Sequence, residues 1–186
     1  MKALEEMFAN TGALQKGHFR LTSGLHSDIY LQCALVLQYP DRAHQMAEEM
    51  AKLLGDVKPD VVVGPAMGGV TWAYQLGLTL GCRALFAERS EDVMSLRRGF
   101  SVKPGEKVLV AEDVSTTGGS AMEVIRLLEG YRANILGVAL IVDRTAGKLD
   151  FGVPYWSLYQ IEPKVWRPAD CPQCQAGIPT DKPGSR

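Results

Sequence analysis

The sequence predicts an α/β fold: a central, mostly parallel sheet with helices on both faces. Short runs that are apolar throughout, such as DVVVG and KVLVAED, alternate with segments of helical periodicity after residue 40. Strands that are apolar at every position are typical of parallel sheets buried on both faces, whereas half-exposed strands alternate. The length of 186 residues and the hydrophobic content of 46% are sufficient for a single well-packed domain.

The first forty residues do not follow this alternating pattern. MKALEEMFANTGAL predicts a helix, because its apolar residues recur at helical spacing. HFRLTSGLHSDIYLQCAL predicts two short strands joined by a turn at Ser23-Gly24. We expect residues 1–40 and residues 150–186 to pack together as a small cap. The cap and the alternating core would form one phosphate-binding domain that spans residues 1–186, as the motifs below indicate.

The alternating core begins with DRAHQMAEEMAKLLG, which follows Pro40 and ends at Gly55. Its apolar side chains fall on one face, so the segment predicts an amphipathic helix. That face comprises Ala43, Met46, Ala47, Met50 and Leu54. DVVVG then predicts a strand, GGVTWAYQLGLTLG a helix and RALFAE a strand.

The remaining core elements continue the same order. SEDVMSLRRGFSVKPGE is polar and predicts a loop, and KVLVAED, TGGSAMEVIRLLEG and NILGVALIVDR predict a strand, a helix and a strand. Open parallel sheets bind their ligands beyond the C-terminal ends of the strands. The candidates for a functional site are therefore the residues that follow each strand: 64–69, 88–89, 112–120 and 143–144.

The segment VLVAEDVSTTGGS is the most informative of these strand ends. A strand that ends in a small, polar, glycine-rich turn and opens a helix favours anions, because the first N–H groups of a helix are unpaired and its dipole adds partial positive charge. Gly118 and Gly119 let the backbone approach a ligand closely, and Thr116, Thr117 and Ser120 add hydroxyl donors. This cradle suits a phosphate monoester.

Two carboxylates, Glu112 and Asp113, come directly before the cradle and would repel a bare phosphate. Carboxylates accept hydrogen bonds from hydroxyl groups and attract hard cations such as Mg²⁺. The residues alone therefore predict a sugar phosphate with free hydroxyls, with or without a bound metal. The alternative explanation is an ordinary helix start beside a solvated strand end.

The same segment resembles the phosphoribosyl-pyrophosphate (PRPP) signature of the type I phosphoribosyltransferases, which has an apolar strand, two acidic residues and a phosphate loop rich in threonine and glycine. Nearly the whole chain resembles the orotate-specific bacterial members of that family. GHFRLTSGLHSDIYLQCAL resembles their N-terminal segment, and GPAMGGV resembles their pyrophosphate loop. FAERSEDVMSLRRGF resembles their mobile loop, and GVALIVDR resembles the strand that brings an arginine to orotate.

This resemblance implies a pentosyl transferase, or glycosyltransferase, of de novo pyrimidine (UMP) synthesis. It would move the 5-phosphoribosyl group of PRPP to orotate, giving orotidine 5′-phosphate and pyrophosphate. The resemblance also implies Mg²⁺ carried by PRPP without a direct protein ligand, and a homodimer whose active sites are shared across the interface. Two alternatives stay open: a purine or xanthine phosphoribosyltransferase, and a non-catalytic PRPP-sensing regulator on the same fold.

The resemblance also implies roles for single residues. Glu112 and Asp113 would hold the ribose hydroxyls, and Arg89 would contact pyrophosphate, so these three are the candidate catalytic residues. The candidate PRPP site comprises Arg89, Glu112, Asp113, Val114, Ser115, Thr116, Thr117, Gly118, Gly119 and Ser120. The pyrophosphate loop comprises Pro65, Ala66, Met67, Gly68 and Gly69. Orotate would be bound by Thr116, Arg144 and His26. The mobile loop would bring Arg97 and Arg98 to the neighbouring subunit's site.

The chain departs from the family pattern at the pyrophosphate end. Better-known family members carry a lysine where this chain has Gly68 and another where it has His26. Their mobile loop contains lysines and a histidine, whereas SEDVMSLRRGF contains neither. Stabilisation of the leaving pyrophosphate would therefore fall to Arg89, Arg97, Arg98 and Mg²⁺.

Composition argues against several other classes of protein. The net charge of −1 gives no electrostatic sign of a nucleic-acid partner. No apolar run approaches the roughly 18 residues that span a bilayer. The N-terminus lacks the apolar core of a secretory signal, so we expect a cytoplasmic protein with no membrane partner.

The four cysteines do not form a disulfide framework in a chain of this length. Cys33 and Cys82 lie in apolar contexts and are interpreted as small core residues. Cys171 and Cys174, in CPQC, are half of a zinc knuckle, but the sequence has neither a second CxxC nor a histidine near them. We interpret CPQC as a plain turn, with metal binding and redox activity as the less favoured readings.

Overall fold

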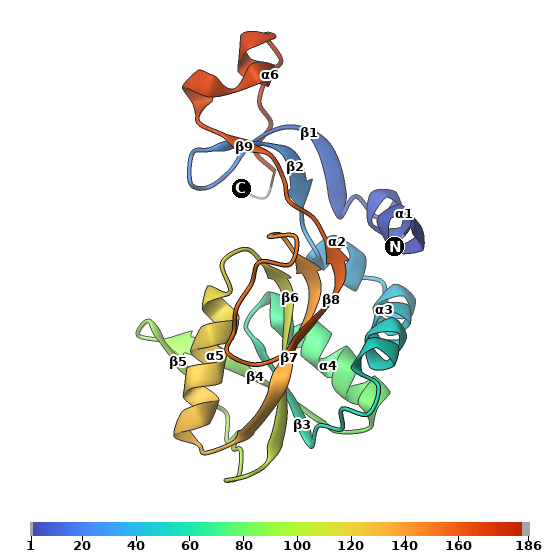
Figure 1. Ribbon diagram of the computed structural model, residues 1–186, viewed down its shortest axis with the longest axis vertical. Coiled ribbons are helices and arrows are strands. Elements are labelled where there is room, and N and C mark those ends of the chain that lie inside the picture. Colours follow the sequence, from blue (N-terminus) through green and yellow to red (C-terminus); the bar gives the residue numbers. More distant parts are fainter. Residues whose placement is uncertain (1, 184–186) are drawn as a thin grey trace. The chain divides into compact units, whose positions relative to one another are not determined.

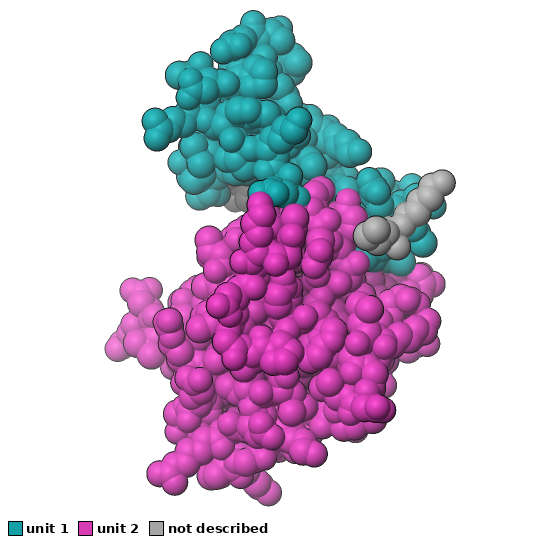
Figure 2. All heavy atoms as spheres, viewed as in Figure 1, with its two compact units in different colours: residues 1–36, 162–186 teal, residues 37–161 magenta. Residues whose placement is uncertain are grey.

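The computed structural model describes residues 2–183, and Figure 1 shows its helices and strands. The chain forms two compact units, coloured separately in Figure 2. Unit 1 combines residues 1–36 with residues 162–186, and unit 2 comprises residues 37–161. No helix in the described part of the chain is long and apolar enough to cross a membrane.

Unit 2 contains a six-stranded sheet in the order β5-β4-β3-β6-β7-β8. All neighbouring strands are parallel except β5, which pairs antiparallel with β4 at one edge. The strands are β3 (Val61–Pro65), β4 (Arg83–Ser90), β5 (Val93–Ser95), β6 (Lys107–Ser115), β7 (Asn134–Asp143) and β8 (Tyr155–Gln160). The predicted α/β class with a mostly parallel sheet is confirmed.

Helices cover both faces of this sheet, with α5 on one face and α3 and α4 on the other (Figure 1). These helices are α3 (Pro40–Leu54), α4 (Gly68–Leu80) and α5 (Gly119–Gly130), and the short helix α2 (Ala34–Leu37) spans the point in the chain where unit 1 ends and unit 2 begins. The apolar face predicted after Pro40 is the buried face of α3: Ala43, Met46, Ala47, Met50 and Leu54.

The inner strands are apolar at every position because each strand face meets a helix layer. The cluster that includes α5 takes alternate residues of β3, β6 and β7: Val61, Val63, Val108, Val110, Val138 and Leu140. The intervening residues point to the other face. They are equally buried: Val62, Leu109, Ala139 and Ile141 are each 0% exposed.

Two predictions about unit 2 were wrong. Residues 155–160 form β8, so the chain after residue 150 does not all belong to a terminal cap, and unit 2 extends to residue 161. YWSLYQ is an edge strand and lacks the continuous apolar run that revealed the inner strands. The short strand β5 was also missed, because three residues within a polar loop carry too little periodicity.

Unit 1 is built on a three-stranded antiparallel sheet in the order β1-β2-β9. The predicted turn at Ser23-Gly24 is confirmed, and Gly24 adopts a positive φ of 83° there. The C-terminal tail returns to this sheet, where Asp181 pairs with Phe19. The elements of unit 1 are α1 (Lys2–Asn10), β1 (Leu14–Arg20), β2 (His26–Leu31), β9 (Val165–Trp166), the 3-10 helix η1 (Pro168–Asp170) and α6 (Pro172–Gln175).

The two cysteines predicted to be core residues differ. Cys33 is 1% exposed, as predicted. Cys82 is only partly buried, because it lies in the turn between α4 and β4, directly after the glycine that ends the helix. All four cysteines are free thiols.

Candidate active site

Strand β6 brings two adjacent carboxylates, Glu112 and Asp113, to its C-terminal part. Glu112 is 7% exposed, and its Oε2 is buried with no hydrogen-bond partner in the described chain. Burial and the neighbouring charge of Asp113 raise the pKa of Glu112 to about 7, although Ser120 and the Ala121 N–H approach its carboxylate and partly offset this rise. Burial also raises the pKa of Asp113. A buried acceptor without a donor is costly. Glu112 therefore suits a ligand that brings hydroxyl donors.

The predicted phosphate loop, Thr116–Ser120, connects β6 to α5. Gly118 caps the helix with a φ of 80°, and a Cβ there would lie 2.9 Å from the ring of Phe151, so glycine is required. The first N–H groups of α5 have no partners within the helix and are available to an anion. The loop borders a pocket of about 280 Å³. The pocket is lined by Arg89, Glu112, Val114, Ser115, Thr116, Thr117, Gly118, Gly119, Ser120 and Glu123.

The predicted pyrophosphate loop, Pro65–Gly69, connects β3 to α4 and contains a cis peptide between Ala66 and Met67. Gly68 lies against the side chain of Asp113, and a Cβ at position 68 would overlap the Asp113 carboxylate. The family resemblance would place a lysine at position 68, and the Cβ of that lysine would fit only if the Asp113 side chain moved away. The position of the Asp113 carboxylate therefore depends on a glycine at position 68.

The three arginines predicted to act on pyrophosphate are ion-paired to glutamates. Arg89 makes a two-point contact with Glu123 of α5, with Nε–Oε2 at 3.0 Å and Nη2–Oε1 at 2.9 Å. Arg98 donates to Glu88, with Nη2–Oε2 at 3.2 Å, and the Nε of Arg97 lies 4.0 Å from the same carboxylate. These side chains are exposed enough that solvent weakens the pairs.

Arg144, at the end of β7, is the opposite case. Its guanidinium makes no ion pair with any described residue, and its Nε is buried without a hydrogen-bond partner. Burial lowers the pKa of Arg144. Its backbone N–H donates to the carbonyl oxygen of Ser115 at 2.9 Å, which places Arg144 beside the start of the phosphate loop. A partly buried guanidinium without a carboxylate partner suits an anionic ligand.

Asp143 holds the turn that carries Arg144. It is 0% exposed, and its carboxylate accepts hydrogen bonds from Thr145 N and Oγ1, both at 2.7 Å. It also accepts from Gly147 N at 2.8 Å and from the Tyr155 hydroxyl at 3.2 Å. Because these donors occupy the carboxylate, Asp143 positions Arg144 and is not itself available to a ligand.

The structure therefore joins most of the predicted residues in unit 2. The shared pocket joins Arg89, Glu112 and the phosphate loop, while Gly68 contacts Asp113 and Arg144 contacts Ser115. Sequence reasoning missed Glu123 and the pairing role of Glu88. Ion-pair partners of exposed arginines leave no pattern in the sequence.

His26 and CPQC lie together in unit 1. His26 is 5% exposed within unit 1, where its Nδ1 lies 2.9 Å from His18 Nε2 and 3.3 Å from Cys174 Sγ. Its Nδ1 therefore faces this cluster, and the predicted contact of His26 with orotate stays a prediction. No histidine lies near CPQC in the sequence, but β1 and β2 bring His18 and His26 to it in the structure.

Comparison with known proteins matches residues 36–172 to a family model described as the phosphoribosyl transferase domain. The chain is 54% identical over 183 residues to an orotate phosphoribosyltransferase of Thermotoga maritima, covering 98% of each protein. It is 51% identical over 181 residues to an orotate phosphoribosyltransferase of Caldicellulosiruptor bescii, covering 97% of this chain and 95% of the relative.

Solved structures share the fold. An orotate phosphoribosyltransferase from Aeropyrum pernix has a TM-score of 0.74 at 23% identity, covering 86% of this chain and 94% of that one. An adenine phosphoribosyltransferase from Rhodothermus marinus has a TM-score of 0.69 at 19% identity, covering 86% and 99%. The fold is thus common to enzymes named for a pyrimidine and for a purine, and it does not decide the base.

Proposed function

We propose that this chain, which belongs to the phosphoribosyl transferase family, transfers the 5-phosphoribosyl group of PRPP to orotate. The products are orotidine 5′-phosphate and pyrophosphate, and the reaction is a step of de novo pyrimidine (UMP) synthesis. Relatives named orotate phosphoribosyltransferase match nearly the whole chain at 54% and 51% identity. None of the four cysteines forms a disulfide, which is consistent with a cytoplasmic enzyme.

Arg144 is the observation that carries the choice of orotate. Orotate has a carboxylate next to its ring, and a guanidinium binds such a planar pair of oxygens through two parallel hydrogen bonds. The buried Nε of Arg144, which has no partner in the described chain, would gain one. Purine bases and xanthine have no carboxylate, and a regulator that only senses PRPP needs no group for a base.

The other end of the pocket suits PRPP. We assign the 5′-phosphate to the N–H and hydroxyl groups of Thr116–Ser120, and the ribose hydroxyls to Glu112 and Asp113. In this arrangement Glu112 Oε2 accepts the hydrogen bond that it lacks in the free protein. Such donors favour the ionised carboxylate, so we expect PRPP to lower the pKa of Glu112 from its raised value of about 7.

The reaction is a displacement at the anomeric carbon of the ribose. A ring nitrogen of orotate forms the new carbon–nitrogen bond and releases its proton to solvent or to the departing pyrophosphate. The carbon–oxygen bond to pyrophosphate breaks, and its electron pair leaves with the pyrophosphate. Positive character develops on the ribose, beside Glu112 and Asp113, and negative charge develops on the leaving group, beside Arg89. The chain acts by positioning and by electrostatic stabilisation, without a covalent intermediate.

Magnesium fits the pyrophosphate end of the site as an ion carried by the substrate. The loop Pro65–Gly69 offers no acidic side chain of its own, and Asp113 is the carboxylate that lies against it at Gly68. Mg²⁺ usually keeps several waters and binds substrate phosphates with one or two carboxylates. Bound to PRPP, the ion would neutralise part of the charge on the leaving pyrophosphate.

We also propose a homodimer in which the loop that carries Arg97 and Arg98 closes over the neighbouring subunit's site and excludes water. Chains with Arg97→Ala and Arg98→Ala, mixed with Asp113→Asn chains, should then regain activity, because each heterodimer contains one intact site. Activity is measured after co-refolding or co-expression, with each variant alone as control. Mixtures no more active than the separate variants would contradict sharing of the site.

The proposed reaction is tested by following orotate consumption spectroscopically with PRPP and Mg²⁺, with hypoxanthine and xanthine as control bases. We expect orotate to be consumed in a PRPP-dependent reaction and the purine bases to remain. Turnover of a purine base instead would support the related purine or xanthine enzyme. Binding of PRPP without turnover of any base would favour the non-catalytic regulator.

A further inference from the structure

We propose that unit 1 contains a structural zinc site formed by His18, His26, Cys171 and Cys174. The four potential ligand atoms lie within 4.8 Å of one another. They are His18 Nε2, His26 Nδ1 and the two Sγ atoms. None of these four residues lines the pocket assigned to PRPP.

The distances fit a tetrahedral ion. Zinc bonds of about 2.0–2.1 Å to nitrogen and about 2.3 Å to sulfur place neighbouring ligand atoms roughly 3.3–3.8 Å apart. In the structure His18 Nε2 lies 3.3 Å from Cys171 Sγ and 3.6 Å from Cys174 Sγ. His26 Nδ1 lies 3.3 Å from Cys174 Sγ and 2.9 Å from His18 Nε2. The longest separation among the four atoms is 4.8 Å, so binding of the ion requires that pair to close by about 1 Å, while the other shifts are a few tenths of an ångström.

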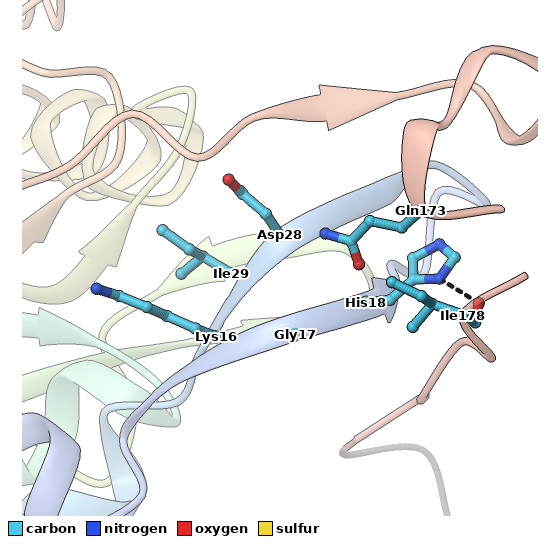
Figure 3. Close-up of a pocket in the computed structure, with 7 residues that line it drawn as sticks. All are labelled: Lys16, Gly17, His18, Asp28, Ile29, Gln173 and Ile178. Carbon is cyan, nitrogen blue, oxygen red and sulfur yellow. Dashed lines mark hydrogen bonds between the residues drawn. The ribbon is translucent and has the colours of Figure 1, made fainter. Parts of the chain in front are cut away.

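The hydrogen bond made by the other ring nitrogen of His18, Nδ1, also supports a metal site. His18 Nδ1 lies 2.8 Å from the carbonyl oxygen of Ile178, as Figure 3 shows. A carbonyl can only accept, so Nδ1 donates this bond, and in the neutral tautomer that donates it the lone pair of Nε2 is directed into the cluster. Histidines that bind metals usually fix their tautomer in this way, by donating the other ring N–H to a carbonyl or carboxylate.

Ordinary hydrogen bonding does not explain the cluster. The single lone pair of His18 Nε2 faces three groups at 2.9–3.6 Å: His26 Nδ1 and the two thiols. One lone pair accepts one good hydrogen bond, which leaves the other buried groups poorly matched. His18, His26 and Cys171 are only 4%, 5% and 0% exposed, so water does not readily replace the missing partners. A cation at the centre would satisfy all four groups.

The local backbone explains why residues far apart in the sequence meet here. His18 lies where the register between β1 and β2 shifts, between the Lys16↔Ile29 and Phe19↔Ser27 pairs. Such a bulge re-aims a side chain. His26 begins β2 and pairs with Trp166 of β9. The chain then passes through η1 into α6, and this turn presents Cys171 and Cys174 to both histidines.

The donor set selects zinc. Two imidazole nitrogens and two sulfurs in a tetrahedral arrangement are typical of structural zinc, whereas magnesium and calcium require oxygen ligands. Four protein ligands leave no open position for water or substrate, so the site is structural and not catalytic. Cys174 is the most exposed of the four residues and gives the ion access to the cluster.

A structural ion has a clear task in unit 1. A unit of roughly 60 residues buries too little apolar surface to be very stable alone, and small units are commonly stabilised by metals or disulfides. The described buried side chains of unit 1 are mostly those of Phe8, Ala13, Leu14, Phe19, Cys33 and Val36. The ion would fasten the segment after β9 to the β1–β2 hairpin, and would also support the neighbouring tail, in which Asp181 N donates to His18 O at 2.7 Å.

The test is the metal content of the full-length protein, measured by elemental mass spectrometry after purification without chelators or added metal. We expect about one zinc ion per chain. Cys171→Ser and Cys174→Ser should lower the affinity for zinc at least tenfold in competition with a chromogenic chelator. The matched control is Cys82→Ser, because Cys82 is a partly exposed thiol of unit 2 and should leave the zinc content unchanged.

Cobalt exchange keeps the proposal testable if the serine variants do not fold. Replacing zinc with Co²⁺ in the unmodified chain should give the intense visible absorption of a tetrahedral site together with sulfur-to-cobalt charge transfer. Removing the metal should make the C-terminal tail more sensitive to limited proteolysis. Three results would overturn the proposal. The purified chain could contain no metal and have reactive thiols at Cys171 and Cys174, the fresh protein could contain a Cys171–Cys174 disulfide, or the cobalt spectrum could be the weak one of an octahedral site.

Discussion

The base end and the pyrophosphate end of the proposed site differ in whether their arginines are ion-paired in the free protein. Arg144 has a guanidinium with no ion-pair partner among the described residues and a buried Nε without a hydrogen bond. Arg89 and Arg98 are bound to Glu123 and Glu88. At the base end, the guanidinium of Arg144 is thus already available to a ligand. At the pyrophosphate end, Arg89 and Arg98 must first exchange their glutamate partners for phosphate oxygens.

The energetic difference follows from solvent exposure. An exposed ion pair contributes about 0–1 kcal/mol, so opening the pairs of Arg89 and Arg98 costs little, and phosphate oxygens provide stronger two-point partners. A buried polar atom without a partner costs about 1–3 kcal/mol. Arg144 and Glu112 both have such an atom in the free protein. Substrate binding would remove that cost, so we expect these two residues to contribute more to substrate binding than the paired arginines.

The largest expected effect is that of Arg144→Ala. It should lower kcat/KM for orotate about a hundredfold or more, because truncating one partner of a buried charge pair costs roughly 2–5 kcal/mol, while the KM for PRPP changes little. Arg144→Lys should recover only part of the loss, since a lysine cannot form the two-point contact. Steady-state kinetics with each substrate varied in turn measures this. A similar loss for both substrates would break the assignment of Arg144 to the base end.

Asp113→Asn should lower turnover at least tenfold, which corresponds to about 1.4 kcal/mol in the barrier. The substitution removes the charge next to the proposed ribose and beside Gly68, where the pyrophosphate loop begins its helix. The matched control is Asp150→Asn, an exposed acid that accepts a bond only from the Gly152 N–H in the described chain. Unchanged kinetics for Asp113→Asn would remove its proposed role.

Glu112→Gln should stabilise the free protein at high pH. The pKa of Glu112 is raised from 4.5 to about 7 in the folded protein. As the pH rises from about 4.5 to about 7, the unfolded chain therefore ionises this group before the folded chain does, and the folded state loses stability. A neutral glutamine avoids this loss. We expect equal stability near pH 4 and roughly 1–3 kcal/mol more for the variant at pH 8, with activity lost. Denaturant unfolding at both pH values checks this, and destabilisation at both would contradict it.

The smallest expected effect is that of Glu123→Gln, which frees Arg89 from its ion pair. The KM for PRPP should fall, by at most about fivefold, because an exposed pair contributes less than about 1 kcal/mol. Glu129→Gln, an exposed glutamate of the same helix, is the control and should change nothing. A KM that rises for Glu123→Gln would show that Glu123 assists Arg89 and does not compete with pyrophosphate.

The sequence predicted the parts of the site that are contiguous in the chain. VLVAEDVSTTGGS holds its strand, both carboxylates and the phosphate loop within 13 residues, so local rules on strands, turns and helix starts were sufficient. The buried face of α3 was predicted for the same reason, because its periodicity lies within one element.

The features that were missed depend on pairs distant in the sequence. Cys171 and His18 meet across 153 positions, and Arg89 and Glu123 across 34. No local pattern marks such partners, and a plain CxxC looks the same with or without two histidines folded beside it. The edge strand β8 escaped because most of its residues are only partly buried, which weakens the apolar pattern.

The contrast between the two ends is tested most directly by a crystal structure with orotate and magnesium pyrophosphate, a pair that cannot react without ribose. We predict that Arg144 binds the orotate carboxylate with little movement. Arg89 should leave Glu123 to contact pyrophosphate in its own site, and Arg98 should leave Glu88 to contact pyrophosphate in the neighbouring subunit's site. Persistence of both ion pairs beside bound pyrophosphate, or orotate bound away from Arg144, would contradict the account.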